Sequence, residues 1–390
     1  MEDLKAKATA AYVLAYGEPL NNDARVHLPG SIDELAFSAI QKAVNNDPYH
    51  PKVYWVDCGP HSLSGLEVPG GRYSYDNPDS IYRIIPISGA CRYVVRGQRF
   101  DPGPSDLTFS LIRNPNSQRT ISVLTGDELE LNADGSYEIT IDSYPAGGRA
   151  NHIQSDEHAR QLLVRNALGD WNAETPDALT VELLDDHSPH PEPSLDQIAS
   201  WAEDNLIQSI VDYGIGALGI KTMRQPVNFL ANPEQSPLLG TLVTQASSFG
   251  HFSVGGDFAM IITLKPGGAT YFVVPVTNPW MITTDPGYYP LSLNNTQALP
   301  NPDGTYTLVL SPLDGGVYNW LDTGGMISGT LMLRWQNLPS PDDAPEVSVE
   351  IVPFHDQRQV LPPGTRFVTQ AERKELTARR LAGYQRRFED

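Results

Sequence analysis

The sequence predicts a mainly β fold, built from two jelly-roll-like β-sandwich modules that arose by internal duplication, with a linking helix and terminal helices. Three blocks of sequence occur twice, in the same order and at an offset of 168 or 169 residues: 132–141 with 301–310, 161–165 with 330–334, and 179–184 with 347–352. Each block is short, rich in β-branched residues and largely alternating or apolar, which is typical of β-strands. The 32 glycines and 33 prolines among 390 residues suit many short strands joined by tight turns.

These repeats, together with the helical and linker patterns around them, divide the chain into five segments. We expect an N-terminal helical and loop segment, a first β-sandwich module, a helical linker, a second β-sandwich module and a C-terminal helix, at residues 1–66, 67–190, 191–230, 231–356 and 357–390. A chain of this length supports two or three domains with ample core.

Capping boxes predict where three helices begin. In each, Ser or Thr is followed three residues later by Glu or Gln, so that both side chains can bond free backbone amides. These pairs predict a helix from Ser31 to about Val44, a linking helix at 194–213, and a last helix that starts at Thr369. Gly214 is expected to end the linking helix, because glycine favours the position just past a helix end.

Further strands of the first module are predicted where short apolar runs are separated by turn residues, at 81–87, 92–97, 107–112 and 120–124. The strand at 137–141 follows Asp134-Gly135, a dipeptide typical of a tight hairpin turn.

Charge and composition exclude several classes of protein. A net charge of −20 disfavours binding to nucleic acid or to anionic membrane surfaces, which repel an acidic body. No stretch reaches eighteen apolar residues, and the N-terminus lacks the apolar core of a secretory signal, so we expect a cytoplasmic protein. The chain has only Cys58 and Cys91, which are too few for a framework of disulfide bonds to stabilise it. The oligomeric state stays open, with a homodimer one possibility.

Several motifs of the second module stand in an order that resembles one bacterial family: 294–298, 301–304, 319–325 and 334–336. The first module carries a related run at 76–82. The chain resembles the family catalogued as domain of unknown function 1214, over roughly residues 70 to 355. This resemblance implies jelly-roll-like β-sandwich modules and a bacterial origin, and it implies no settled substrate.

The polar loop at 319–325 is the strongest candidate for a site. Asp322 and Asn319 flank Trp320, and Trp335 follows on the next predicted strand. An aspartate partly desolvated by indole rings would have a raised pKa, suited to general acid or base catalysis. The alternative is a turn locked by its own side chains, in which Asp322 bonds the backbone.

We expect one cleft to combine residues of both modules. The second module would contribute aromatic and polar side chains, and the first would add an amide and a phenol: Trp280, Tyr288, Asn294, Asn319, Trp320 and Asp322, with Asn77 and Tyr82. We place the cleft here because the two repeats differ at this loop: residues 319–322 correspond to 151–154, which lack both the tryptophan and the carboxylate. Asn77 in a simple turn, and aromatic rings that fill core, are the alternatives.

Arg165 and Arg334 occupy equivalent positions inside apolar strands. A buried guanidinium must be paired, so each is expected either to meet a carboxylate of its own module, with Asp170 and Asp322 as candidates, or to bind a carboxylate or phosphate group of a substrate. The sequence leaves both readings open.

The function predicted from these features is a cofactor-free enzyme. It would act on a small apolar or amphiphilic molecule by acid–base chemistry, as a lyase, isomerase, cyclase or hydrolase, with catalytic Asp322, Asn319 and Tyr82. The alternative is a non-catalytic β-sandwich protein that binds a small molecule or carbohydrate. No nucleotide-binding motif is present, and the polar loops at 152–158 and 185–190 lack the spacing of a metal site.

Overall fold

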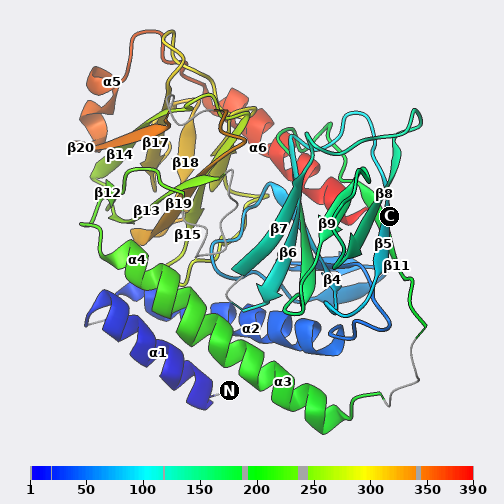
Figure 1. Cartoon of the computed structure of the whole chain (residues 1–390). Coiled ribbons are helices and arrows are strands. Elements are labelled where there is room, and N and C mark those ends of the chain that lie inside the picture. The colour runs from blue at the N-terminus through cyan, green and yellow to red at the C-terminus, as the bar shows by residue number, and fades with distance from the viewer. Residues whose placement is uncertain are drawn as a thin grey trace.

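The computed structural model describes residues 2–18, 20–116, 119–186, 192–235, 245–339 and 344–389. The fold is mainly β, with two halves that each contain two sheets, a central helix between them in sequence, and helices near both ends. Figure 1 shows the N-terminal helices and the central helix lying along one side of both halves.

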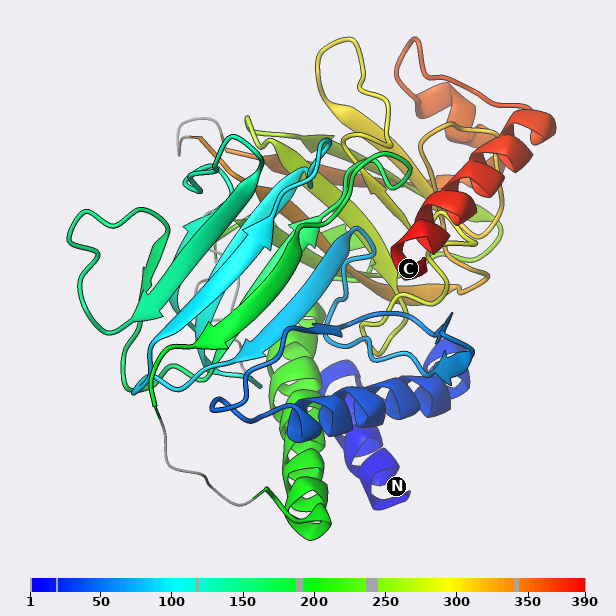
Figure 2. The ribbon, with the colours of Figure 1, turned by 90° about the vertical axis from the view of Figure 1, so that its right-hand side faces the viewer.

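The first half places a five-stranded sheet against a four-stranded one. In spatial order the larger sheet contains β1 (Tyr54–Val56), β4 (Ser80–Pro86), β10 (Gln161–Ala167), β6 (Asp106–Asn114) and β7 (Arg119–Thr125). The smaller contains β11 (Ala178–Leu183), β5 (Tyr93–Gln98), β8 (Ser136–Asp142) and β9 (His152–Gln154). A short hairpin, β2 (His61–Leu63) with β3 (Leu66–Val68), lies outside these sheets. Figure 2 shows β4, β10, β6 and β7 side by side.

The second half repeats this arrangement. Its larger sheet contains β12 (Phe229–Leu230), β13 (Ala246–Ser253), β19 (Ser328–Gln336), β15 (Tyr271–Thr277) and β16 (Ser292–Asn294). Its smaller sheet contains β20 (Glu346–Pro353), β14 (Phe258–Lys265), β17 (Tyr306–Ser311) and β18 (Trp320–Asp322). The strand orders correspond one to one, and both smaller sheets end in a parallel pair. Tyr137 and Tyr306 therefore lie on equivalent strands, as the repeated blocks predict.

Side chains of the central strands point alternately into the sandwich core and onto the outer face of the larger sheet. In β10, Leu162 and Val164 point into the core of the first half, and in β19, Leu333 and Trp335 point into the core of the second. Residues at the intervening positions lie on the opposite face because successive side chains alternate along a strand. That face meets the helices and the other half.

The N-terminal helices are α1 (Glu2–Tyr16) and α2 (Asn22–Val44). The predicted start at Ser31 is wrong: α2 begins nine residues earlier, where the Asn21 side chain accepts a hydrogen bond from the Ala24 amide at 2.8 Å. Pro29 lies inside the helix, and Ser31 is buried and accepts a hydrogen bond from Asn278. The hydroxyl thus connects two segments and caps nothing.

The linking helix begins as predicted and continues further than predicted. The Ser194 capping box is present, and α3 (Leu195–Ile207) continues through a π-helix, η1 (Gln208–Gly219), into α4 (Ile220–Met223). Gly214 does not end the helix. A Cβ there would lie only 2.9 Å from the Ser209 carbonyl of the same π-helix, so glycine relieves a clash inside the helix.

After the second half the chain forms η3 (Phe354–Asp356), α5 (Gln357–Val360), α6 (Gln370–Gln385) and η4 (Arg386–Phe388), and the predicted capping box at Thr369 is present. The turn at Asp134-Gly135 does not connect a hairpin, because β8 pairs with β5 and β9 while the preceding β7 belongs to the other sheet. Among the described residues, no helix combines the length and apolar character needed to cross a membrane.

Candidate functional site

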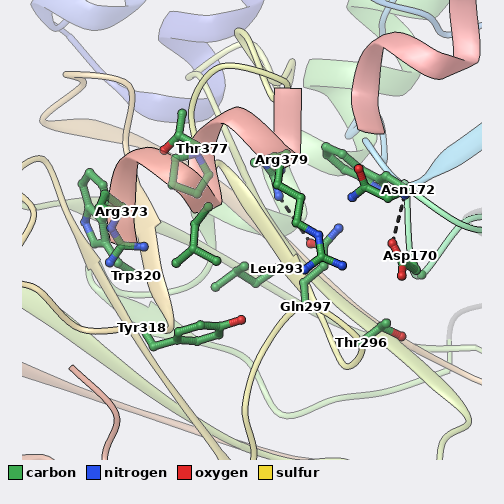
Figure 3. Close-up of a pocket in the computed structure, with 15 residues that line it drawn as sticks. Asp170, Asn172, Leu293, Thr296, Gln297, Tyr318, Trp320, Arg373, Thr377 and Arg379 are labelled. Carbon is green, nitrogen blue, oxygen red and sulfur yellow. Dashed lines mark hydrogen bonds between the residues drawn. The ribbon is translucent and has the colours of Figure 1, made fainter. Parts of the chain in front are cut away.

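A groove lies where α6 crosses between the two halves. Its volume is about 200 Å³, and we call it the α6 groove; its lining comes from the loop after β10, from the second half and from α6: Gly169, Asp170, Trp171, Asn172, Pro290, Leu293, Thr296, Gln297, Tyr318, Trp320, Arg373, Leu376, Thr377, Arg379 and Arg380. Figure 3 shows Trp320 with Arg373 at one end and Asp170 with Asn172 at the other. The groove therefore exists only when both halves and α6 are assembled.

Arg373 fixes the start of α6 on the second half. Its guanidinium pairs with Asp314 at 2.9 Å, donates to the Val317 carbonyl at 2.5 Å, and lies 5.2 Å from the centre of the Trp320 ring. Asp314 therefore compensates the charge of Arg373, and the Arg373 guanidinium holds the Trp320 indole in place beside the groove.

Arg380 connects the middle of α6 to both halves. It donates to the Pro286 carbonyl at 2.7 Å and the Ser292 hydroxyl at 2.9 Å, and its guanidinium carbon lies 4.2 Å from the centre of the Trp171 ring. Burial lowers the pKa of Arg380 to about 10, with the nearby Asp79 opposing that shift. Arg380 therefore stays charged at neutral pH and serves the packing of α6.

Arg379 differs from these two arginines. Its side chain is exposed, and among the described residues it makes no hydrogen bond or ion pair. It is therefore the cation of the α6 groove that is available to a ligand.

A buried carboxylate orients the base of the groove. Asp79 has no exposed surface, and it accepts hydrogen bonds from Trp171 Nε1 at 2.9 Å, Tyr271 Oη at 2.7 Å and Asn294 Nδ2 at 2.9 Å. Burial raises the pKa of Asp79, and these donors oppose the shift. Asn77 donates to the same Tyr271 hydroxyl at 2.9 Å. The network thus joins the first half to the second and fixes the plane of the Trp171 ring.

Asp322 has features of both alternatives raised by the sequence, a self-locked turn and a desolvated carboxylate. Its carboxylate accepts a hydrogen bond from the Gly324 amide at 2.9 Å, as in a self-locked turn. Burial raises its pKa to about 6; Asp314 adds to the shift, while the Gly324 amide and Arg373 oppose it. Asp322 lies beside Arg373 and outside the lining of the groove.

The neighbours of Asp322 divide between groove and loop. Trp320 lines the groove and donates from Nε1 to the Ser311 carbonyl at 3.0 Å. Asn319 accepts from the Leu299 amide at 2.8 Å and donates to the carbonyls of Leu299 and Thr307, so its amide holds a loop in place.

The other predicted site residues lie in four separate places. Tyr82 and Arg334 are near each other in a buried junction between the halves. Trp335 is in the core of the second half, and Trp280 packs against Tyr12 of α1 and donates to the Ala24 carbonyl. Tyr288 is 55% exposed. Of the predicted set, Trp320 lines the α6 groove, Asp322 adjoins it, and Asn77 and Asn294 belong to the network beneath.

The two equivalent arginines do not meet the carboxylates expected for them. Arg334 donates to the Tyr75 carbonyl, while Asp322 lies near Arg373. Asp170 accepts from the amide of Asn172. Within the described part of the chain, no group of three His, Cys, Asp or Glu residues is arranged to hold a metal ion. Residues 187–190 of the predicted polar linker lie outside the described residues.

Sequence reasoning missed the residues that make the groove basic. The tail between 373 and 387 is rich in arginine, and Arg373 and Arg380 pack against the second half through Asp314 and the Pro286 carbonyl. Nothing in the local pattern distinguishes Arg379 from them. The roles of Trp171 and Asp79 depend on contacts between residues 92 positions apart, which periodicity does not reveal.

The comparisons with known proteins establish the fold alone. No family model matches the chain, and no curated protein matches it. The crystal structure of an uncharacterized protein from Burkholderia cenocepacia is similar over 91% of this chain and 96% of its own, with 22% identity and a TM-score of 0.75. A protein from Vibrio parahaemolyticus aligns over 89% of this chain and 100% of its own, with 11% identity and a TM-score of 0.44. The first of these shows that both halves and their helices recur together in another protein.

Proposed function

We propose that the α6 groove binds a small amphiphilic organic anion. The supporting observation is the exposed Arg379 beside the apolar and aromatic surfaces of Leu293, Leu376 and Trp320. Aromatic and aliphatic walls bury the body of a ligand, while an unpaired guanidinium selects an acidic group. The volume of about 200 Å³ suits a ligand with one ring better than a nucleotide.

Isothermal titration with benzoate and with the uncharged, nearly isosteric benzamide tests this proposal. We expect benzoate to bind the wild type several-fold more tightly, because only its carboxylate pairs with Arg379. Arg379→Gln should remove that preference. Lys374→Gln is the matched control, since Lys374 is exposed on the same helix and does not line the groove. Equal affinity of wild type and Arg379→Gln for benzoate would rule the proposal out.

A second candidate function, acid–base catalysis at this groove without a cofactor, is favoured by the raised pKa of Asp322. A carboxyl group that titrates at about 6 can both donate and accept a proton near neutral pH. In this hypothesis Arg379 would hold the anionic substrate, and Asp322 would act at the end of the groove where Trp320 and Arg373 lie. A substrate screen that compares wild type with Asp322→Asn tests it: full turnover by a folded variant excludes Asp322 from the chemistry.

We also propose a more specific architecture and evolutionary origin for the two halves. We infer that the two halves are jelly-roll-like and descend from an internal duplication, on the basis of their matching strand orders. The resemblance to domain of unknown function 1214, a cytoplasmic location and a possible homodimer are also part of it.

A further inference from the structure

Asp170 lies at one end of the α6 groove and keeps half of its carboxylate free. Its Oδ1 accepts a hydrogen bond from the Asn172 amide at 2.9 Å. Its Oδ2 accepts no hydrogen bond within the described part of the chain, and no Lys, Arg or His there forms an ion pair with Asp170. Because Asp170 is partly exposed and lines the groove, it offers a hydrogen-bond acceptor to a ligand.

The loop that carries Asp170 is fixed by contacts that leave this oxygen unused. The Glu174 carboxylate accepts hydrogen bonds from the amides of Gly169 at 2.7 Å and Asp170 at 3.2 Å. Trp171, the next residue along the chain, donates to the buried Asp79 at 2.9 Å. Of the two carboxylates in this loop, Glu174 therefore shapes the backbone, and Asp170 is held in place at the groove before a ligand arrives.

The groove thus presents a cation and a carboxylate that are not paired with each other. Arg379 also lines the groove, and it forms no ion pair among the described residues. Figure 3 shows Arg379 between Asp170 at one end of the groove and Trp320 at the other. A carboxylate bound by Arg379 therefore has Asp170 on one side and an aromatic surface on the other.

The negative charge of Asp170 decides what the ligand must carry besides its acid group. A second carboxylate on that side would be repelled by Asp170. A hydroxyl or ammonium group on that side would instead donate a hydrogen bond to Oδ2, and a hydrogen bond to an ionised acceptor is roughly twice as strong as one between neutral groups. Asp170 therefore favours a donor next to the acid group of the ligand.

We propose that the ligand of the α6 groove carries a hydrogen-bond donor on the carbon atom next to its carboxylate, as a 2-hydroxy or 2-amino acid does, and that Asp170 Oδ2 accepts from this donor. This assignment rests on the proposed function, because Arg379 must hold the carboxylate. The hydroxy acid would bind as an anion and the amino acid as a zwitterion. With the ring against the apolar surface, the three contacts distinguish the two enantiomers of such an acid, which makes Asp170 a residue that determines specificity.

Isothermal titration of the full chain at neutral pH with phenylacetate, mandelate and phenylglycine tests this proposal, because the three acids differ only at the carbon next to the carboxylate. We expect one enantiomer of mandelate or of phenylglycine to bind the wild type about tenfold more tightly than phenylacetate does. The acid that binds more tightly identifies the donor as hydroxyl or ammonium.

Asp170→Asn should lose both this preference and the discrimination between enantiomers. Asparagine keeps an oxygen for the Asn172 amide and replaces Oδ2 with an NH₂ group, which donates and does not accept. Glu375→Gln is the matched control and should bind as the wild type does, because Glu375 is exposed on α6 and lies outside the lining of the groove.

Phenylacetate separates a failure of this proposal from a failure of the proposed function. If phenylacetate binds and loses affinity in Arg379→Gln, but no enantiomer of the other two acids binds more tightly, only the role of Asp170 is wrong. If none of the three acids binds, or if binding is the same in Arg379→Gln, both proposals are wrong.

An Asp170→Asn variant that binds all three acids more tightly by the same factor would show that Asp170 acts on Arg379 and not on a donor of the ligand, and this too would overturn the proposal. The comparison of the three acids on the wild type needs no variant. It therefore decides the matter even if Asp170→Asn fails to fold.

Discussion

Replacing Asp322 with asparagine should remove a pH-dependent loss of stability. The pKa of Asp322 rises from 3.8 to about 6 in the folded protein because its carboxylate is buried. The folded state therefore holds this proton more tightly than the unfolded state, so the free energy of unfolding falls as pH rises from about 4 to 6 and then levels off. A shift of about two units corresponds to about 3 kcal/mol.

Urea unfolding of wild type and Asp322→Asn across pH 4 to 7.5 measures this effect. Asparagine keeps the oxygen that accepts from the Gly324 amide, so the variant should gain stability relative to the wild type as pH rises, by up to about 3 kcal/mol. Asp303→Asn is the control, because hydrogen bonds from Thr305 lower the pKa of Asp303 and its variant should change in the opposite direction. Parallel curves for wild type and Asp322→Asn would show that the Asp322 carboxylate is not desolvated in solution.

Three further changes test the network, the linking helix and α6. Tyr271→Phe removes a donor to the buried Asp79 and should lower the free energy of unfolding by about 1 to 3 kcal/mol, measured in urea; no loss would mean that water replaces the hydroxyl. Gly214→Ala places a methyl group 2.9 Å from the Ser209 carbonyl and should lower the melting temperature, and a rise would contradict the close approach. Thr369→Ala deletes the cap of α6, so it should cost about 1 kcal/mol and weaken benzoate binding, seen by titration; unchanged affinity would show that the helix end does not support the groove.

Much of the β architecture could be predicted because strands depend on local patterns. The strand at 161–165 is recognisable from its apolar run alone, and its match with 330–334 identifies it as one of two equivalent strands. The capping boxes at Ser194 and Thr369 could also be predicted from the sequence, because a cap is made by side chains within one turn. The capping rule gave a wrong helix start at Ser31, because the Ser31 hydroxyl accepts a hydrogen bond from Asn278 and does not cap the helix.

The candidate site was predicted less well because it depends on contacts between distant segments. Asp322 and Trp320 were recognised as unusual, and the structure places both beside α6, but Tyr288 and Trp280 face solvent and the N-terminal helices instead. Divergence between repeats indicates which loop has changed. It does not indicate which surface that loop faces.

By itself, the sequence determined the strand-rich character, the repetition of strand order and the caps of two helices, since each is encoded within a few adjacent residues or by comparison of the chain with itself. Only the tertiary structure decided which groups are buried together. The three hydrogen-bond donors to Asp79 and the exposure of Arg379 both arise from how the two halves and α6 pack. Desolvation and electrostatic pairing act through space, so the chemistry of these sites follows from packing that no local pattern contains.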